Sequence, residues 1–158
     1  MALIIDRKPV TEDRWQWLAD DQALPAEGPV VLPLARWLDE ADALAGRETG
    51  VQVNGDDDLQ QVLALQDRVS LFAVEFPAFT DGRGFSIARL LRRGGFKGEI
   101  RAIGDVTRDR LAHLERCGFN ALQVPDERYS PDVLQAFDEI GVQYQGGAAL
   151  TRPAYPVR

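Results

Sequence analysis

The residues best suited to bind a ligand lie in one short turn between two apolar segments. The run Val69–Phe76 predicts a buried strand, and the spacing of apolar residues across 85–93 predicts a helix. Glycines in the turn let a ligand approach the backbone, and the helix start offers unpaired N–H groups and a positive dipole end. This combination is typical of an anion site. The candidate ligand-binding residues of the turn are Asp81, Gly82, Arg83, Gly84 and Ser86.

Arg83 is the candidate contact for the anion. Its guanidinium donates two parallel hydrogen bonds, which suits a sulfur or phosphorus oxyanion. No packing role for the glycines on either side of it is evident from the sequence, and this favours a functional interpretation. Arg89, one turn into the same helix, is a further candidate that either reaches back to the turn or pairs with a neighbouring acid.

Polar residues also follow four successive predicted strands. In parallel α/β sheets ligands bind outside the carboxyl ends of the strands, so these residues are expected at one edge. One interpretation is a shared pocket, in which carboxylates bind polar groups or a cation. The other is that they are ordinary turn and N-cap residues. They are Asn54, Asp56, Asp81, Arg83, Asp105 and Asp126, and Asp105 joins the candidate ligand-binding set.

Familiar catalytic and cofactor motifs are missing from the chain. His113 and Cys117 share one side of a predicted helix, but no other His or Cys exists to complete a zinc site, so we predict no metal site of that kind. The segment 82–87 lacks the third glycine of a dinucleotide fingerprint. No flavin, nicotinamide, haem or iron–sulfur motif is visible, so the cofactor is unknown.

The elements that must position these residues alternate regularly from residue 29 onward. Short strands are predicted near 30–32, 50–53, 69–76, 99–103, 120–124 and 142–144, with helices between them, including one opened by Thr107 and one by Ser130. This order predicts an α/β fold with a mainly parallel sheet of repeated βαβ units. We favour a doubly wound open sheet; the alternative is an incomplete β/α barrel, whose exposed edges need a homodimer or the N-terminal segment as a cover.

Three regions are expected along the chain: an N-terminal appendage at 1–28, an α/β domain at 29–150 and an irregular tail at 151–158. Arg101 is unusual because it lies inside a predicted strand. It is expected either to face solvent or to form a structural ion pair, with Glu75 on the adjacent strand as the candidate partner.

Composition narrows the class of protein. The 158 residues carry a net charge of −7, which argues against nucleic acid or an anionic membrane as the main partner. The single cysteine excludes an internal disulfide and fits a reducing cytoplasm. No apolar run is long enough to span a bilayer.

Several motifs resemble a proteobacterial domain family of unknown function that is often labelled "oxidoreductase". They are Phe76-Pro77, 81–86 (Asp-Gly-Arg-Gly-Phe-Ser), 98–106 and Arg116-Cys117-Gly118-Phe119. Genes of this family commonly lie beside the gene for assimilatory sulfite reductase haemoprotein. Arg110 departs from the family pattern, where glutamine is expected.

The resemblance implies a cytoplasmic accessory role in assimilatory sulfate and sulfite reduction, with sulfite reductase as a partner. Together with the anion-binding turn, it leads to the first hypothesis: an accessory protein whose loop 81–86 binds a small oxyanion or a partner. A second hypothesis is a small enzyme that uses the strand-end carboxylates with a divalent metal. A third is an oxidoreductase subunit that works with sulfite reductase.

Overall fold

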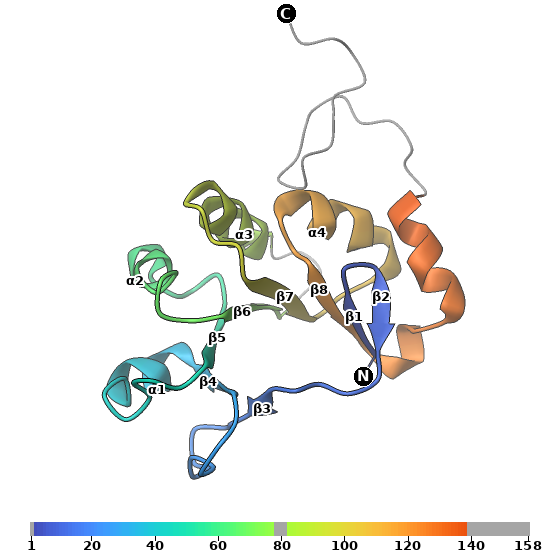
Figure 1. Cartoon of the computed structure of the whole chain (residues 1–158). Helices are drawn as coiled ribbons and strands as arrows, with labels where there is room; N and C mark the ends of the chain where they lie inside the picture. Colours follow the sequence, from blue (N-terminus) through green and yellow to red (C-terminus); the bar gives the residue numbers. More distant parts are fainter. Residues whose placement is uncertain (1, 78–81, 139–158) are drawn as a thin grey trace, which may run out of the picture.

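The computed structural model describes residues 2–77 and 82–138 and contains one mixed sheet (Figure 1). Its eight strands are β1 (Ala2–Ile5), β2 (Lys8–Val10), β3 (Gln16–Trp17), β4 (Val30–Pro33), β5 (Thr49–Val53), β6 (Leu71–Phe76), β7 (Glu99–Gly104) and β8 (Ala121–Val124). The helices are α1 (Leu34–Asp39), α2 (Leu59–Ala64), α3 (Arg83–Arg93) and α4 (Leu111–Cys117). Three 3₁₀ segments are η1 (Arg108–Arg110), η2 (Asp126–Arg128) and η3 (Pro131–Asp138).

The strand order is β2-β1-β8-β7-β6-β5-β4-β3. Strands β3 to β8 are parallel and follow one another across the sheet in chain order, whereas β1 pairs antiparallel with both β8 and β2. Right-handed crossovers between sequential neighbours place the connecting helices on the same side of a sheet. Figure 1 shows this arrangement, with α1 to α4 along the convex side of the curled sheet.

The predicted α/β class and mainly parallel sheet are therefore confirmed. The sheet is a curled, open half-barrel, which is consistent with the incomplete-barrel alternative. The doubly wound arrangement that we favoured is not confirmed. Among the described strands, the order β3 to β8 contains no reversal, and a doubly wound sheet requires one at its switch point.

The main core lies between the sheet and the helices. Strand β6 is buried over almost its whole length because Phe72, Val74 and Phe76 point to the helices and Leu71 and Ala73 to the opposite face. Near-continuous apolar strands of this kind are typical of parallel sheets covered on both faces. The hydrophobic run that predicted this strand therefore reflects burial from two sides.

The N-terminal segment supplies the cover on the concave face. Trp15 is buried there against Val31, Leu71 and Ala73, in a small core separate from the main one. Residues 2–17 also contribute β1, β2 and β3 to the same sheet. The segment thus acts as part of the sheet and as a partial lining of the half-barrel.

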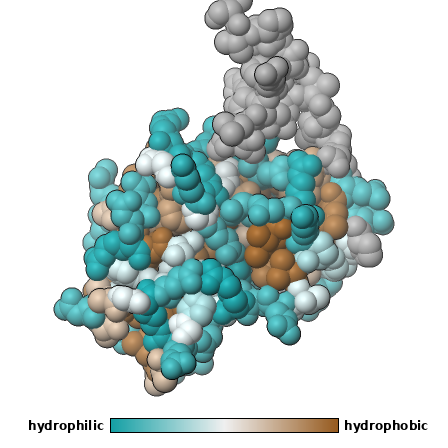
Figure 2. All heavy atoms as spheres, viewed as in Figure 1, coloured by the Kyte–Doolittle hydropathy of each residue, from teal (hydrophilic) through white to brown (hydrophobic). Residues whose placement is uncertain are grey.

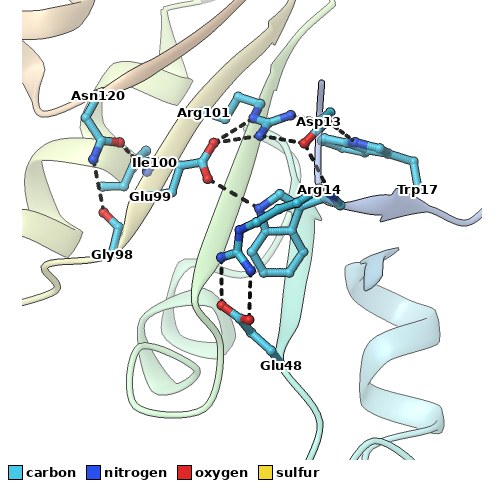
Figure 3. A network of polar contacts seen from close by, with 10 residues as sticks. Asp13, Arg14, Trp17, Glu48, Gly98, Glu99, Ile100, Arg101 and Asn120 are labelled. Atoms are coloured by element: carbon cyan, nitrogen blue, oxygen red, sulfur yellow. Dashed lines mark hydrogen bonds and ion pairs between the residues drawn. The ribbon is translucent and has the colours of Figure 1, made fainter. Parts of the chain in front are cut away.

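An ionic network joins this segment to the sheet (Figure 3). The fully buried Arg101 on β7 donates to Asp13 at 2.7 Å and to Glu99 at 2.8 Å, and Trp15 Nε1 donates to Glu99. The predicted partner of Arg101 was wrong: Glu75 instead accepts a hydrogen bond from Gln52. A structural ion pair exists, but its partners come from the N-terminal segment and from β7 itself.

Element ends differ from the predicted ones in a few places. The spacing of apolar residues across 34–44 predicts one helix there, but α1 ends at Asp39. The Thr107 side chain makes no capping bond to the helix that it precedes. The strand predicted at 142–144 and the tail 151–158 lie outside the described residues. In the part of the chain that is described, no helix is both long and apolar enough to cross a membrane.

Candidate functional site

The candidate anion site lies where β6 ends and α3 begins, at the carboxyl edge of the parallel strands. Gly82 is the N-cap residue of α3 and has no side chain of its own to cap this end of the helix. Phe85 N–H donates to the carbonyl of Gly82, and Ser86 is exposed in the first turn. Among the described residues, no acidic side chain lies in the first turn of α3, where the helix dipole places partial positive charge.

Gly84 has a packing role that the sequence did not reveal. A Cβ at this position would lie 2.7 Å from the Phe76 ring and 2.9 Å from Val74 Cγ1. Glycine therefore lets α3 pack closely on β6, as small residues do where a helix meets a sheet. The argument that no packing role requires these glycines was therefore wrong for Gly84.

Arg83 points from the start of α3 to the turn after β5. Its Nη1 lies 2.7 Å from the Asp56 carboxylate, and both side chains are exposed, at 56% and 79%. A Cβ at Gly55 would lie 2.6 Å from Arg83 Nε, so glycine there lets the guanidinium lie on the turn. The fold thus brings together two of the strand-end polar residues, Asp56 and Arg83, from neighbouring strands.

Asn54 stabilises the turn on which Arg83 lies. Its side chain accepts from Asp56 N–H at 2.8 Å, and its own N–H donates to the Asp57 carboxylate at 2.8 Å. The ordinary interpretation of Asn54 as a turn residue is therefore correct, because its side-chain oxygen is used inside the turn.

A second guanidinium, that of Arg110, lies on the other side of the start of α3. It lies 5.1 Å from the ring centroids of both Phe76 and Phe85, within cation–π range. Its Nη1 also donates to the carbonyl of Asp105 at 3.3 Å. Because Phe85 is in the first turn of α3, this contact fixes a positive charge beside the helix start. Arg110 was not among the site residues predicted from the sequence.

Asp105 follows β7 beside the end of β6. Its N–H donates to the carbonyl of Phe76 at 2.8 Å, and the preceding Gly104 has a φ of +86°. A Cβ at Gly104 would lie 2.4 Å from the carbonyl oxygen of Phe76. The sharp turn at Gly104 therefore ties the two strand ends together and places Asp105 at the predicted edge.

Among the described residues, Arg89 neither reaches back to the turn nor pairs with a neighbouring acid. Its Nε donates to Cys117 Sγ at 3.4 Å, so the side chain lies against α4 rather than at the turn. Asp81 lies outside the described residues, and Asp126 is exposed at the start of η2. Within residues 2–77 and 82–138, no group of three or more His, Cys, Asp or Glu side chains could hold a metal ion.

His113 lies in the contact between α3 and α4. Its ring is 4.6 Å from that of Phe85, and its Nδ1 is 3.1 Å from Arg116 Nη2. Burial, followed by the positive charges of Arg116, Arg89 and Arg110, lowers the pKa of His113. Arginine can only donate, so Nδ1 accepts and the proton of the neutral ring is on Nε2, which faces Cys117 Sγ at 3.8 Å.

A cavity of about 360 Å³ lies at the opposite edge of the sheet, away from the turn. It adjoins the β1–β2 hairpin, over which Figure 2 shows a hydrophobic patch. Arg7 pairs with Glu115 at 2.6 Å on its rim, and Arg92 donates to the carbonyls of Phe96, Gly98 and Gly118. These contacts hold the hairpin and the ends of α3 and α4 together, so we interpret this edge as structural.

Comparison with known proteins identifies the family. Residues 50–155 match the model of a family described as bacterial protein of unknown function (DUF934), and the chain belongs to this family. The matched region begins within β5 and includes the turn 81–86, α3 and α4. Neither the curated proteins nor the solved structures gave a match.

Proposed function

We propose that this member of the DUF934 family binds a small oxyanion at the start of α3. The observation that carries the proposal is the position of two guanidinium groups, those of Arg83 and Arg110, on either side of a helix start whose N-cap residue is Gly82. Backbone N–H groups at such a start point towards solvent, and the helix dipole favours negative charge there.

Arg83 is the group expected to bind the anion. It is exposed, and its present partner Asp56 is even more exposed, so water weakens their attraction. An oxyanion at this position would accept hydrogen bonds both from Arg83 and from the N–H groups of α3, whereas Asp56 accepts from Arg83. Binding then includes the replacement of the exposed contact between Arg83 and Asp56 by one between Arg83 and the ligand.

We further propose that the chain acts in the cytoplasm as an accessory protein of assimilatory sulfate and sulfite reduction, with sulfite reductase as its partner. The motifs at 81–86, 98–106 and 116–119 support this role through the family resemblance drawn from them. The ligands of such a system, sulfite and sulfate, are oxyanions of the kind that a guanidinium fork binds.

A thermal-shift experiment tests the oxyanion site. Sulfite, sulfate and phosphate are added to the wild type, to Arg83→Ala and to Asp56→Ala. A ligand at 100 times its Kd adds about 2.7 kcal/mol, or a rise in Tm of roughly 5–10 °C for a domain of this size. We expect the rise in the wild type, its loss in Arg83→Ala and its retention in Asp56→Ala, because the second variant removes the pair but keeps the guanidinium.

Two results would count against the site. One is the absence of any rise with the three oxyanions, and the other is an equal rise in the wild type and in Arg83→Ala. Magnesium, manganese, flavins and nicotinamides in the same screen test the two enzyme hypotheses. Co-elution of the purified chain with sulfite reductase haemoprotein tests the accessory role separately, so the site and the partner are judged by different measurements.

A further inference from the structure

Charge is distributed unevenly along this acidic chain. Residues 83–116 contain nine Lys and Arg but only four Asp and Glu, whereas the remainder contains nine basic and 21 acidic residues. The first segment spans α3, β7, η1 and α4. This segment therefore carries a net charge of +5 in a protein whose total charge is −7, and two of its arginines, Arg83 and Arg101, pair with carboxylates outside the segment.

The two helices form one continuous surface. Phe85 of α3 packs on His113 of α4, and Arg92 Nε donates to the carbonyl of Gly118 at 2.8 Å. Figure 1 shows α3 and α4 side by side on the convex side of the sheet, and their region is mainly hydrophilic in Figure 2. We call the surface formed by Arg89, Arg93 and Arg116 the basic seam.

The charges of the basic seam are not neutralised by the fold. In the part of the chain that the structure describes, none of these three arginines forms an ion pair with a carboxylate. Arg89 donates to Cys117 Sγ, and Arg116 donates to the neutral His113, so both are fixed in place by uncharged groups. Arg93 is exposed at the end of α3. Burial lowers the pKa of the nearby His113 most, and the positive charges of Arg116, Arg89 and Arg110 lower it further.

We propose that the basic seam docks an acidic segment of a partner protein. Guanidinium groups form bidentate pairs with carboxylates, and a surface of one sign on a protein of the opposite sign orients an approaching partner. A short acidic segment fits this surface, because the three arginines of the basic seam lie on only two helices, α3 and α4. A long polyanion such as a nucleic acid would extend over the acidic remainder of the chain and be repelled by it.

The basic seam is distinct from the oxyanion site proposed above. Arg83 lies on the side of α3 that faces α2 and pairs with Asp56, whereas Arg89 lies against α4. The docking proposal therefore stands or falls independently of the oxyanion, and it adds the chemistry of a partner to the accessory role.

A fluorescence anisotropy titration with a labelled deca-glutamate peptide tests the proposal on the full chain. The seam variant is Arg89→Ala, Arg93→Ala, Arg116→Ala. The matched control is Lys8→Ala, Arg14→Ala, Arg68→Ala, which removes the same charge from exposed residues elsewhere. We expect the wild type and the control to bind, the seam variant to bind at least tenfold more weakly, and affinity to fall as salt screens the charges.

Arg93→Glu is a second variant that keeps the test decisive if the triple seam variant does not fold. Arg93 forms no hydrogen bond or ion pair with the described residues, so its reversal leaves the fold intact and should also weaken binding tenfold or more. Equal losses in the seam and control variants would overturn the proposal. So would tighter binding of a single-stranded oligonucleotide than of the peptide, or self-association of the chain that the seam variant abolishes.

The same variants separate this proposal from the proposed oxyanion site. If both are correct, the seam variant loses the peptide but keeps the rise in Tm with oxyanions, and Arg83→Ala shows the reverse. If the seam variant and Arg83→Ala both lose the rise in Tm with oxyanions, a single diffuse positive field would explain the binding of the peptide and of the oxyanion. The docking proposal would then fail.

Discussion

The guanidinium of Arg101 lies 2.7 Å from the carboxylate of Asp13, across a separation of 88 residues. Arg101 is completely buried on β7, and Asp13 belongs to the segment that crosses the concave face of the half-barrel. Figure 3 shows how Glu99 and Trp17 complete the network. This pair attaches the N-terminal segment to the middle of the sheet.

Replacement of Arg101 should therefore destabilise the whole domain. Arg101→Ala leaves a void and removes the partner of two carboxylates, so we expect a loss of about 3 kcal/mol or more in the free energy of unfolding. Arg101→Lys should also lower the free energy of unfolding, because an ammonium group cannot reproduce the forked contact of the guanidinium. Urea denaturation measures both. Arg14→Ala is the control, since its exposed pair with Glu48 should contribute less than about 1 kcal/mol.

Acid should weaken the same network. Burial alone would raise the pKa of Asp13, but hydrogen bonds from Arg101 and Trp17 and the charge of Arg101 outweigh it and lower the pKa. A lowered folded pKa stabilises the fold above the ordinary value of 3.8, and this contribution disappears as the pH falls from there through the folded pKa. Asp13→Asn should flatten this part of the stability profile, measured by urea unfolding between about pH 2 and pH 5. An unchanged slope would contradict the assignment.

His113 should titrate below the usual value for histidine. It is the only histidine of the chain, so one imidazole signal in an NMR titration reports on it without assignment. We expect a pKa below 6.5, and a higher one in Arg116→Ala, because burial and then Arg116 lower it. Stability should be complete above pH 6.5 and decrease as the pH falls towards the folded pKa. A wild-type pKa at or above 6.5 would contradict the burial of the ring, and an unchanged pKa in Arg116→Ala would contradict the contribution of Arg116.

Replacement by alanine should lower the stability at one of the two glycines beside Arg83 and leave it nearly unchanged at the other. Gly84→Ala places a methyl group 2.7 Å from the Phe76 ring, and we expect a loss of about 1–3 kcal/mol from overpacking. At Gly82 the nearest atom to a new Cβ is Phe85 Cδ2 at 3.8 Å, so Gly82→Ala should be tolerated. Thermal unfolding of the two variants measures the difference. Equal stability would mean that α3 does not pack on β6 as described.

The sequence predicted the local elements well because each leaves a periodic signal. The five strands β4 to β8 lie within two residues of predicted strands, and α2, α3 and α4 lie where helices were expected between them. The turn before α3 was found from its glycines and Arg83, although the packing role of Gly84 was not. Helix ends were less predictable because tertiary contacts, not propensity, decide where the last turn stops.

The sequence by itself determined the order of the elements, the parallel sheet and the position of a cationic turn after β6. Local periodicity and turn residues suffice for these features, since each depends on neighbours in the chain. The tertiary structure decided which distant residues meet: Asp13 with Arg101, Asp56 with Arg83, and Arg110 with Phe76 and Phe85. Such pairs depend on the curvature of the sheet and the packing of helices on it, and no spacing in the chain encodes them.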